Sequence, residues 1–151
     1  MDELDIKLIT LLQEDGRISI SKLSERMALS RPSVAERVKR LEEKGMIEGY
    51  TALISPEAIG RKLLVIIELS DILEPLNKIE EKLASEPAVI ECHRATGHVH
   101  YYIKAALYDI GELTRLVESL LPYGKTKTSV LLGTPVKKRV ILPHDNYHDE
   151  Q

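Results

Sequence analysis

The chain is poor in the residues that mark secreted, metal-binding and membrane proteins. Its 151 residues include one cysteine and neither phenylalanine nor tryptophan. A single cysteine, Cys92, cannot form a disulfide within the chain, and no set of Cys and His residues has zinc-site spacing, which favours a reducing, cytoplasmic location. Because Cys92 lies in a strand pattern, we expect it to be a small buried hydrophobic side chain. The longest apolar run, 63–67, is far too short to cross a bilayer, and the acidic N-terminus lacks a hydrophobic signal region.

The chain also lacks an overall excess of positive charge, since its formal net charge is -3 at pH 7. The charges are unevenly distributed along the sequence. Arg17–Lys44 holds eight Lys or Arg against four Asp or Glu, whereas Met1–Gly16 holds one against five. A local basic region is therefore present within an acidic protein. The length and the 43% hydrophobic content suffice for two small domains with real cores.

Residues 19–45 are typical of two helices joined by a tight turn. Ser19 can accept hydrogen bonds from first-turn N–H groups and so begin the first helix, and Ser30 can begin the second in the same way. Pro32 lies in the first turn of the second helix, where its missing N–H costs nothing, and Gly45 ends that helix. Apolar side chains recur at helical spacing, with Ile20, Leu23 and Met27 on the first helix and Val34, Val38 and Leu41 on the second.

A preceding helix is predicted from about Asp2 to Glu14, because leucines repeat at helical spacing and Asp15-Gly16 follows as a stop signal. After Gly45, the segment Met46 to Ser55 carries β-branched and aromatic residues and is then followed by Pro56. This pattern indicates a short strand or wing. We therefore expect an N-terminal (winged) helix-turn-helix domain.

The second helix of the pair carries a polar, mostly cationic strip. Backbone N–H groups at a helix N-terminus and arginine side chains both bind phosphates, and arginine can also pair with guanine. A charged strip on a single helix is usually a solvated face, but two capped helices with a third before them favour DNA binding. The candidate DNA-binding residues are Ser30, Arg31, Ser33, Arg37, Arg40 and Lys44.

The second half of the chain alternates strand and helix patterns in the order βαββαβ, which is the ferredoxin-like arrangement of an α+β protein. The expected elements are strand 63–69, helix 75–85, strand 89–96, strand 99–107, helix 110–121 and strand 127–132. The first strand is apolar on both faces, although two helices cover only one face of such a sheet. We therefore expect dimerisation through the sheets.

These patterns divide the chain into four parts. Residues 1–55 are expected to form the DNA-binding domain and 56–62 a linker. Residues 63–142 are expected to form the effector-binding and oligomerisation domain, and 143–151 a polar tail. A dimer would present two recognition helices to half-sites about 10 bp apart or a multiple of that spacing.

Three segments resemble the Lrp/AsnC (leucine-responsive, or feast-famine) transcriptional regulators: LDIKLITLLQEDGR at 4–17, SRPSVAERVKRLEEKG at 30–45 and MIEGYTALISPEAIG at 46–60. The resemblance covers nearly the whole chain and implies a sequence-specific regulator of transcription. It further implies sheet-paired dimers, higher assemblies that are commonly octamers, and a possible amino-acid effector. Two positions depart from the family pattern, because Ser24 replaces an alanine and Ala28 replaces a glycine in the turn. If Ala28 needs a positive φ, the strain is about 1 kcal/mol.

The loop around Gly97 is the candidate effector site. In the resembled family the corresponding loop carries glycine followed by acidic residues and lines an amino-acid pocket between dimers. Gly97 matches that pattern, but His98 and His100 stand in place of the acids, and imidazoles suit a carboxylate better than an ammonium group. Three interpretations remain open: an altered effector site, a pH-sensitive interface, and two surface histidines on a hairpin.

Other functions have weaker support in the sequence. Some haem-biosynthetic decarboxylases resemble this family and use histidines, but no catalytic arrangement is recognisable here, so we expect neither an enzyme nor a cofactor. A nucleoid-architectural protein that wraps DNA is the other alternative. The tail 144–149 has His and Asp at a spacing that could hold a metal, and Lys137–Arg139 is a basic run. We expect a flexible polar tail and a solvated strand end instead.

Overall fold

The computed structural model describes residues 1–136 and 139–143. They form two compact units, one made of Met1–Leu53 with the described residues from Val136 onward, and one made of Ile54–Pro135. Each unit has its own hydrophobic core. The predicted tail beyond Pro143 and all but Arg139 of the predicted basic run lie outside the described residues.

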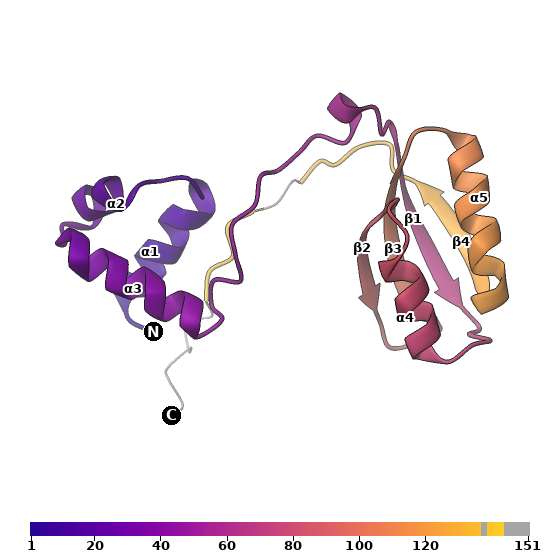
Figure 1. Ribbon diagram of the computed structural model, residues 1–151, viewed down its shortest axis with the longest axis horizontal. Coiled ribbons are helices and arrows are strands. Elements are labelled where there is room, and N and C mark those ends of the chain that lie inside the picture. Colours follow the sequence, from indigo (N-terminus) through magenta and orange to yellow (C-terminus); the bar gives the residue numbers. More distant parts are fainter. Residues whose placement is uncertain (137–138, 144–151) are drawn as a thin grey trace. The chain divides into compact units, whose positions relative to one another are not determined.

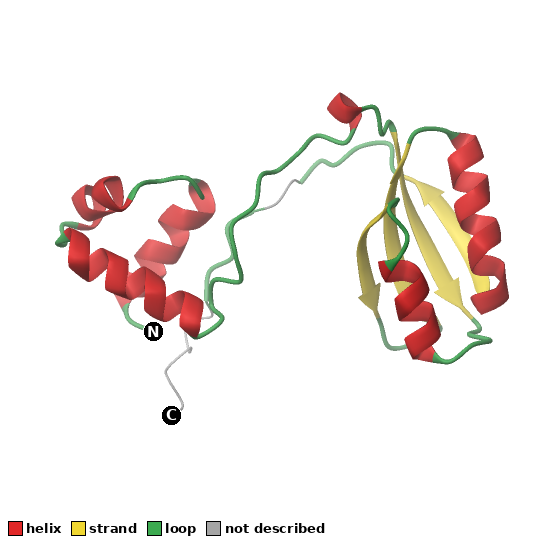
Figure 2. Cartoon of the chain, in the orientation of Figure 1, coloured by secondary structure: helices red, strands yellow, loops and turns green. Residues whose placement is uncertain are grey.

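The first unit is a bundle of three helices, shown in red at the N-terminal end of the chain in Figure 2. They are α1 (Glu3–Glu14), α2 (Ile20–Met27) and α3 (Arg31–Glu43). Its buried apolar side chains are Leu8, Leu23, Met27, Val34 and Leu41, which are among the apolar positions that the helical spacing predicts. Burial of these side chains stabilises the bundle and fixes which face of α3 remains outside.

Side chains cap all three helices. Asp2 and Asp5 form a reciprocal capping box at the start of α1. Ser19 accepts a hydrogen bond from the N–H of Lys22, and Ser30 accepts one from the N–H of Ser33. The helix starts predicted at Ser19 and Ser30 are therefore confirmed.

The turn between α2 and α3 depends on a left-handed residue, because Ala28 has φ 54° and ψ 42°. This conformation is costly for a residue with a Cβ. The hydroxyl of Ser24 donates a hydrogen bond to the carbonyl of Leu29 across the turn. The two departures from the family pattern thus meet in one turn, where the serine adds a contact and the alanine adds strain.

Ala28→Gly is expected to raise the free energy of unfolding of the first unit by about 0.5–1 kcal/mol, because glycine adopts positive φ without strain. Ala35→Gly is the matched control. Ala35 is exposed to solvent in the middle of α3, where glycine should lower the free energy of unfolding by about 1 kcal/mol. Chemical denaturation of both variants measures the two changes in the free energy of unfolding. If Ala28→Gly also lowered the free energy of unfolding, the proposed strain at Ala28 would be contradicted.

The strand predicted at Met46–Ser55 is wrong for this chain. The structure has no strand there, and only a short 3-10 helix, Glu57–Ile59, lies between α3 and the strand that begins at Leu63. Leu53 and Ile54 are 78% and 62% exposed. A strand needs a paired strand for its N–H and C=O groups. The strand pairs among the described residues include none of residues 46–55.

The second unit is a four-stranded antiparallel sheet with two helices on one face (Figure 1). Its elements are β1 (Leu63–Ser70), α4 (Leu76–Ala84), β2 (Val89–Arg94), β3 (Val99–Leu107), α5 (Ile110–Leu120), a 3-10 turn (Leu121–Tyr123) and β4 (Lys125–Val130). The strand order β2-β3-β1-β4 confirms the ferredoxin-like fold. We call the face that α4 and α5 do not cover the open face.

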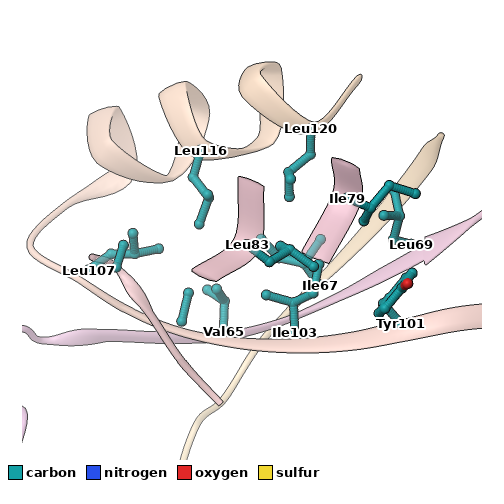
Figure 3. Packing of buried hydrophobic residues seen from close by; sticks show 12 residues of the cluster. Val65, Ile67, Leu69, Ile79, Leu83, Tyr101, Ile103, Leu107, Leu116 and Leu120 are labelled. Carbon is teal, nitrogen blue, oxygen red and sulfur yellow. The ribbon is translucent and has the colours of Figure 1, made fainter. Parts of the chain in front are cut away.

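The core of the second unit lies between the sheet and the two helices. Leu116 and Leu120 of α5 point toward strand residues such as Val65 and Ile103 (Figure 3). The buried Tyr101 keeps its hydroxyl bonded to Glu80 of α4, at 3.1 Å. Burial of these alternating strand residues sets the register of the sheet and therefore which residues reach its ends.

Cys92 corrects one expectation, because its side chain is exposed rather than buried. It lies on β2, which is an edge strand and therefore has a neighbouring strand on one side only. None of the helices in the described residues is long and apolar enough to span a membrane.

The C-terminal segment returns to the first unit. The side-chain amide of Gln13 on α1 makes two hydrogen bonds with the backbone of Ile141, each 2.9 Å long. The predicted end of the effector-binding and oligomerisation domain at residue 142 stays a prediction. A Gln amide that donates to the C=O and accepts from the N–H of one residue holds an extended segment as a neighbouring strand would.

Candidate nucleic-acid interface and effector loop

The N-terminus of α3 is open to solvent. Ser30, Arg31 and Ser33 are all exposed there. The hydroxyls of Ser30 and Ser33 are 2.7 Å apart, and Ser30 also caps the N–H of Ser33. The hydroxyls, the first-turn N–H groups and the Arg31 guanidinium together form a surface suited to phosphate oxygens.

Arg37 and Arg40 are tied to the acidic start of α1. Nη1 of Arg37 lies 2.9 and 2.8 Å from the two carboxylate oxygens of Asp2 and 2.7 Å from Oδ1 of Asp5. Nη2 of Arg40 lies 2.9 Å from the same Asp5 oxygen. The Arg37 side chain is 20% exposed and that of Arg40 is 42% exposed. The sequence did not predict this cluster, because its acids and its arginines lie more than thirty positions apart.

The cluster shifts the pKa values of Asp2 and Arg37. Burial alone would raise the pKa of Asp2, but the hydrogen bond from Arg37, the bond from the N–H of Asp5 and the charges of both arginines hold it below its ordinary value. The hydrogen bonds to Asp2 and Asp5 raise the pKa of Arg37. Since the pKa of Asp2 is lowered by folding, its contribution to stability is present at neutral pH and is lost as pH falls through that lowered value.

The other exposed cations of α3 lie beyond this cluster. Lys44, which follows the helix, is exposed. Lys39 is 67% exposed and pairs with Glu43 at 3.6 Å. Sequence reasoning did not select Lys39, although its exposure makes it as accessible to a phosphate as Lys44.

The candidate effector loop is a tight hairpin between β2 and β3. The N–H of Ala95 donates to the carbonyl of His100 at 2.8 Å, and Gly97 has φ 106°, which favours glycine. His98 is exposed. His100 is half-buried, and within the described residues its buried Nδ1 has no hydrogen-bond partner. A buried imidazole nitrogen without a partner is one that a ligand or a second copy could satisfy.

The sheet register brings two further ionisable groups to this loop. Ser70 pairs with both Val99 and Lys125, so the ends of β1, β3 and β4 meet at one edge. Asp71 follows Ser70 and lies 2.8 Å from Nζ of Lys125. The hydrogen bond and charge of Lys125 lower the pKa of Asp71, and the charges of His98 and His100 add to this. The loop itself lacks acids, but the fold supplies the carboxylate of Asp71, directly after β1.

The open face of the sheet is rich in paired charges. Glu91 accepts hydrogen bonds from His93 at 2.7 Å and Lys104 at 3.1 Å, and these two bonds lower its pKa. A pocket of about 330 Å³ lies on this face and is lined by sheet residues that include Ile66 and Tyr102. Leu131 and residues 133–135 close its other side, so part of the open face is covered by the chain itself.

The described residues contain no group of three His, Cys, Asp or Glu side chains that could hold a metal ion.

The chain matches two family models. Residues 1–48 match a winged helix-turn-helix DNA-binding domain, and residues 64–141 match the Lrp/AsnC ligand-binding domain. The leucine-responsive regulatory protein of Escherichia coli K12 is 38% identical over 128 residues, which are 80% of this chain and 76% of that protein. The protein of the same name from Haemophilus influenzae is 37% identical over 127 residues, or 80% of this chain and 75% of that one.

Solved structures agree over still more of the chain. Bacillus subtilis LrpC superposes with a TM-score of 0.86 at 27% identity, over 91% of this chain and 99% of that one. A Neisseria meningitidis transcriptional regulator in complex with L-Met gives 0.85 at 30% identity, over 93% and 96%. A feast or famine regulatory protein from Mycobacterium tuberculosis, complexed with L-methionine, gives 0.87 at 28% identity, over 94% and 99%. With both domains matched in order, the chain belongs to the Lrp/AsnC family of transcriptional regulators.

Proposed function

We propose that this regulator recognises specific DNA sequences through α3, with Ser30, Arg31, Ser33 and Lys44 contacting phosphates and Arg37 and Arg40 acting at the base edges. The observation that carries the proposal is the exposed, serine-capped N-terminus of α3 with its arginines on one strip. Its relatives are named as regulators, which favours regulation over a decarboxylase-like activity. We propose a cytoplasmic location, which agrees with a DNA-binding role.

Selection of bound DNA from a random pool tests this proposal, with a salt series on the selected and on competitor DNA. A specific regulator yields a shared motif and prefers it over competitor at physiological salt. An architectural protein that wraps DNA would instead show a steep salt dependence with little preference. Failure to enrich any motif would overturn sequence-specific binding.

We propose a homodimer formed through the open face as the DNA-binding species, with further assembly to octamers as the family resemblance implies. Leu64 and Ile66 are only half-buried on this face in a single chain. A second sheet laid on the first would bury them and the pocket beside Ile66. Two copies of α3 would then address the two halves of a pseudo-palindromic site.

We also propose that an amino acid or related metabolite modulates the protein at Gly97, His98 and His100. Support comes from the match to a ligand-binding domain and from two similar proteins solved with L-Met or L-methionine. The imidazoles and Lys125 suit the carboxylate of such a ligand, and Asp71 can face its ammonium group.

A panel of amino acids and their keto-acid analogues is expected to contain a compound that raises the unfolding temperature of the protein, because binding stabilises the folded state. His98→Ala should abolish most of that rise. His93→Ala is the control, since this exposed imidazole bonds to Glu91 on the open face. If the unfolding temperature of His98→Ala rose as much as that of the wild type, the loop would not be part of the binding site. If no compound raised the unfolding temperature, an effector of this class would be contradicted.

A further inference from the structure

Asp5 is the one polar residue buried in the cores of the described chain, with 5% of its surface exposed. Its Oδ1 accepts hydrogen bonds from Arg37 and Arg40, which are three residues apart on α3. A buried carboxylate that joins two neighbouring arginines sets the position of both. We propose that Asp5 is a positioning residue for DNA recognition, which holds the Arg37 and Arg40 guanidinium groups in the orientation that reads base edges. The inference rests on the proposed role of α3.

The hydrogen bonds leave most of each guanidinium group unused. Arg37 bonds to Asp2 and Asp5 only through Nη1, and Arg40 bonds to Asp5 only through Nη2. Within the described residues, the remaining N–H donors of both groups have no hydrogen-bond partner. An arginine that is fixed at one corner still presents the pair of donors that guanine accepts in the major groove.

Positioning matters because a free arginine is flexible. Ordering a long side chain on binding costs conformational entropy. A base contact requires one geometry of the side chain, so it carries more of this cost than a phosphate contact does. Asp5 is itself held by the reciprocal capping bonds with Asp2 at the start of α1. The helix start therefore supports Asp5, and Asp5 supports the two arginines, as an outer shell supports a binding site.

The two acids of the cluster are expected to differ in role. The Asp2 side chain is 53% exposed, whereas the Asp5 side chain is 7% exposed. Solvent reaches Asp2, so its bonds to Arg37 hold the guanidinium group less firmly than the bond of the buried Asp5 does. Both acids therefore contribute to the orientation of Arg37, and Asp5 contributes more.

The test compares Asp5→Asn with Glu3→Gln in the intact protein. Glu3 lies in the same first turn of α1, and its replacement removes the same charge without touching either arginine. Affinity is measured for the DNA selected from a random pool and for scrambled DNA of equal length. Asp5→Asn is expected to weaken binding to the selected DNA about tenfold, with scrambled DNA bound as before or slightly more tightly, because one negative charge is gone. Glu3→Gln should leave the ratio of the two affinities unchanged.

The specificity ratio separates positioning from mere folding support. An equal loss on both DNAs, or an unchanged ratio, would show that Asp5 is only structural. If Asp5→Asn does not fold, Asp2→Asn gives the second test, since asparagine still caps α1 and one of the two carboxylates on Arg37 is lost. It should lower the ratio by a smaller factor, and an unchanged ratio would again overturn the proposal. A wild-type protein that does not prefer the selected DNA would mean failure of the proposed function instead.

Discussion

Replacing Leu64 and Ile66 together by aspartate is expected to leave the protein monomeric and to weaken its binding to a two-half-site DNA by about 100-fold or more. Both residues lie on β1 and face away from the helices, since the alternate residues Val65 and Ile67 are fully buried in the core. Four carboxylates would then face one another across a dimer. Like charges in a desolvated sheet contact are strongly unfavourable, so the two copies separate.

The loss of DNA affinity follows from the loss of bivalency. In a dimer the second copy of α3 binds as an intramolecular event, and a monomer forfeits that gain although each α3 is unchanged. Light scattering at micromolar concentration and DNA titration measure the two effects. Leu73→Asp is the matched control, because Leu73 lies in a loop of the same unit and is 72% exposed. A wild-type monomer, or a dimeric double variant, would contradict sheet-mediated assembly.

The features that the sequence predicted well are local ones. Ser19 and Ser30 begin helices because a hydroxyl and the N–H groups it caps lie within three residues. The positive φ of Ala28 could be anticipated because two helices so close together need a sharp turn. The strand order could be predicted because few topologies satisfy the βαββαβ succession.

The features that the sequence did not predict depend on distant residues. Asp5 and Arg37 meet because α1 packs on α3, and no pattern within either helix indicates that contact. Asp71 and Lys125 come together only through the register of β1 with β4. Cys92 was expected to be buried because its strand pattern gives no sign that β2 is the edge strand. The site residues chosen from one helix or one loop therefore lacked the partners that control them.

The edge of the sheet that carries the effector loop is closely packed at Gly124. Gly124 has φ 159° and ψ -170° and precedes β4. A Cβ at this position would lie 2.5 Å from the carbonyl oxygen of Ser70 and 3.2 Å from that of Asp71. Both contacts are with backbone atoms, which cannot turn aside as a side chain can. Gly124→Ala is therefore expected to lower the free energy of unfolding of the second unit by about 3 kcal/mol, from overpacking and backbone strain.

Chemical denaturation of Gly124→Ala and Gly133→Ala measures this effect. Gly133 is the control, because among the described residues no atom beyond its two chain neighbours lies within 4 Å of a Cβ built there. Relief of the clash must move Gly124 away from β1, and this displaces Lys125 from Asp71, whose ion pair spans that edge. The variant should therefore also respond less to any ligand that binds beside His98 and His100. If Gly124→Ala were as stable as Gly133→Ala, this edge of the sheet could adjust to the added Cβ. A ligand could then change the shape of the edge on binding.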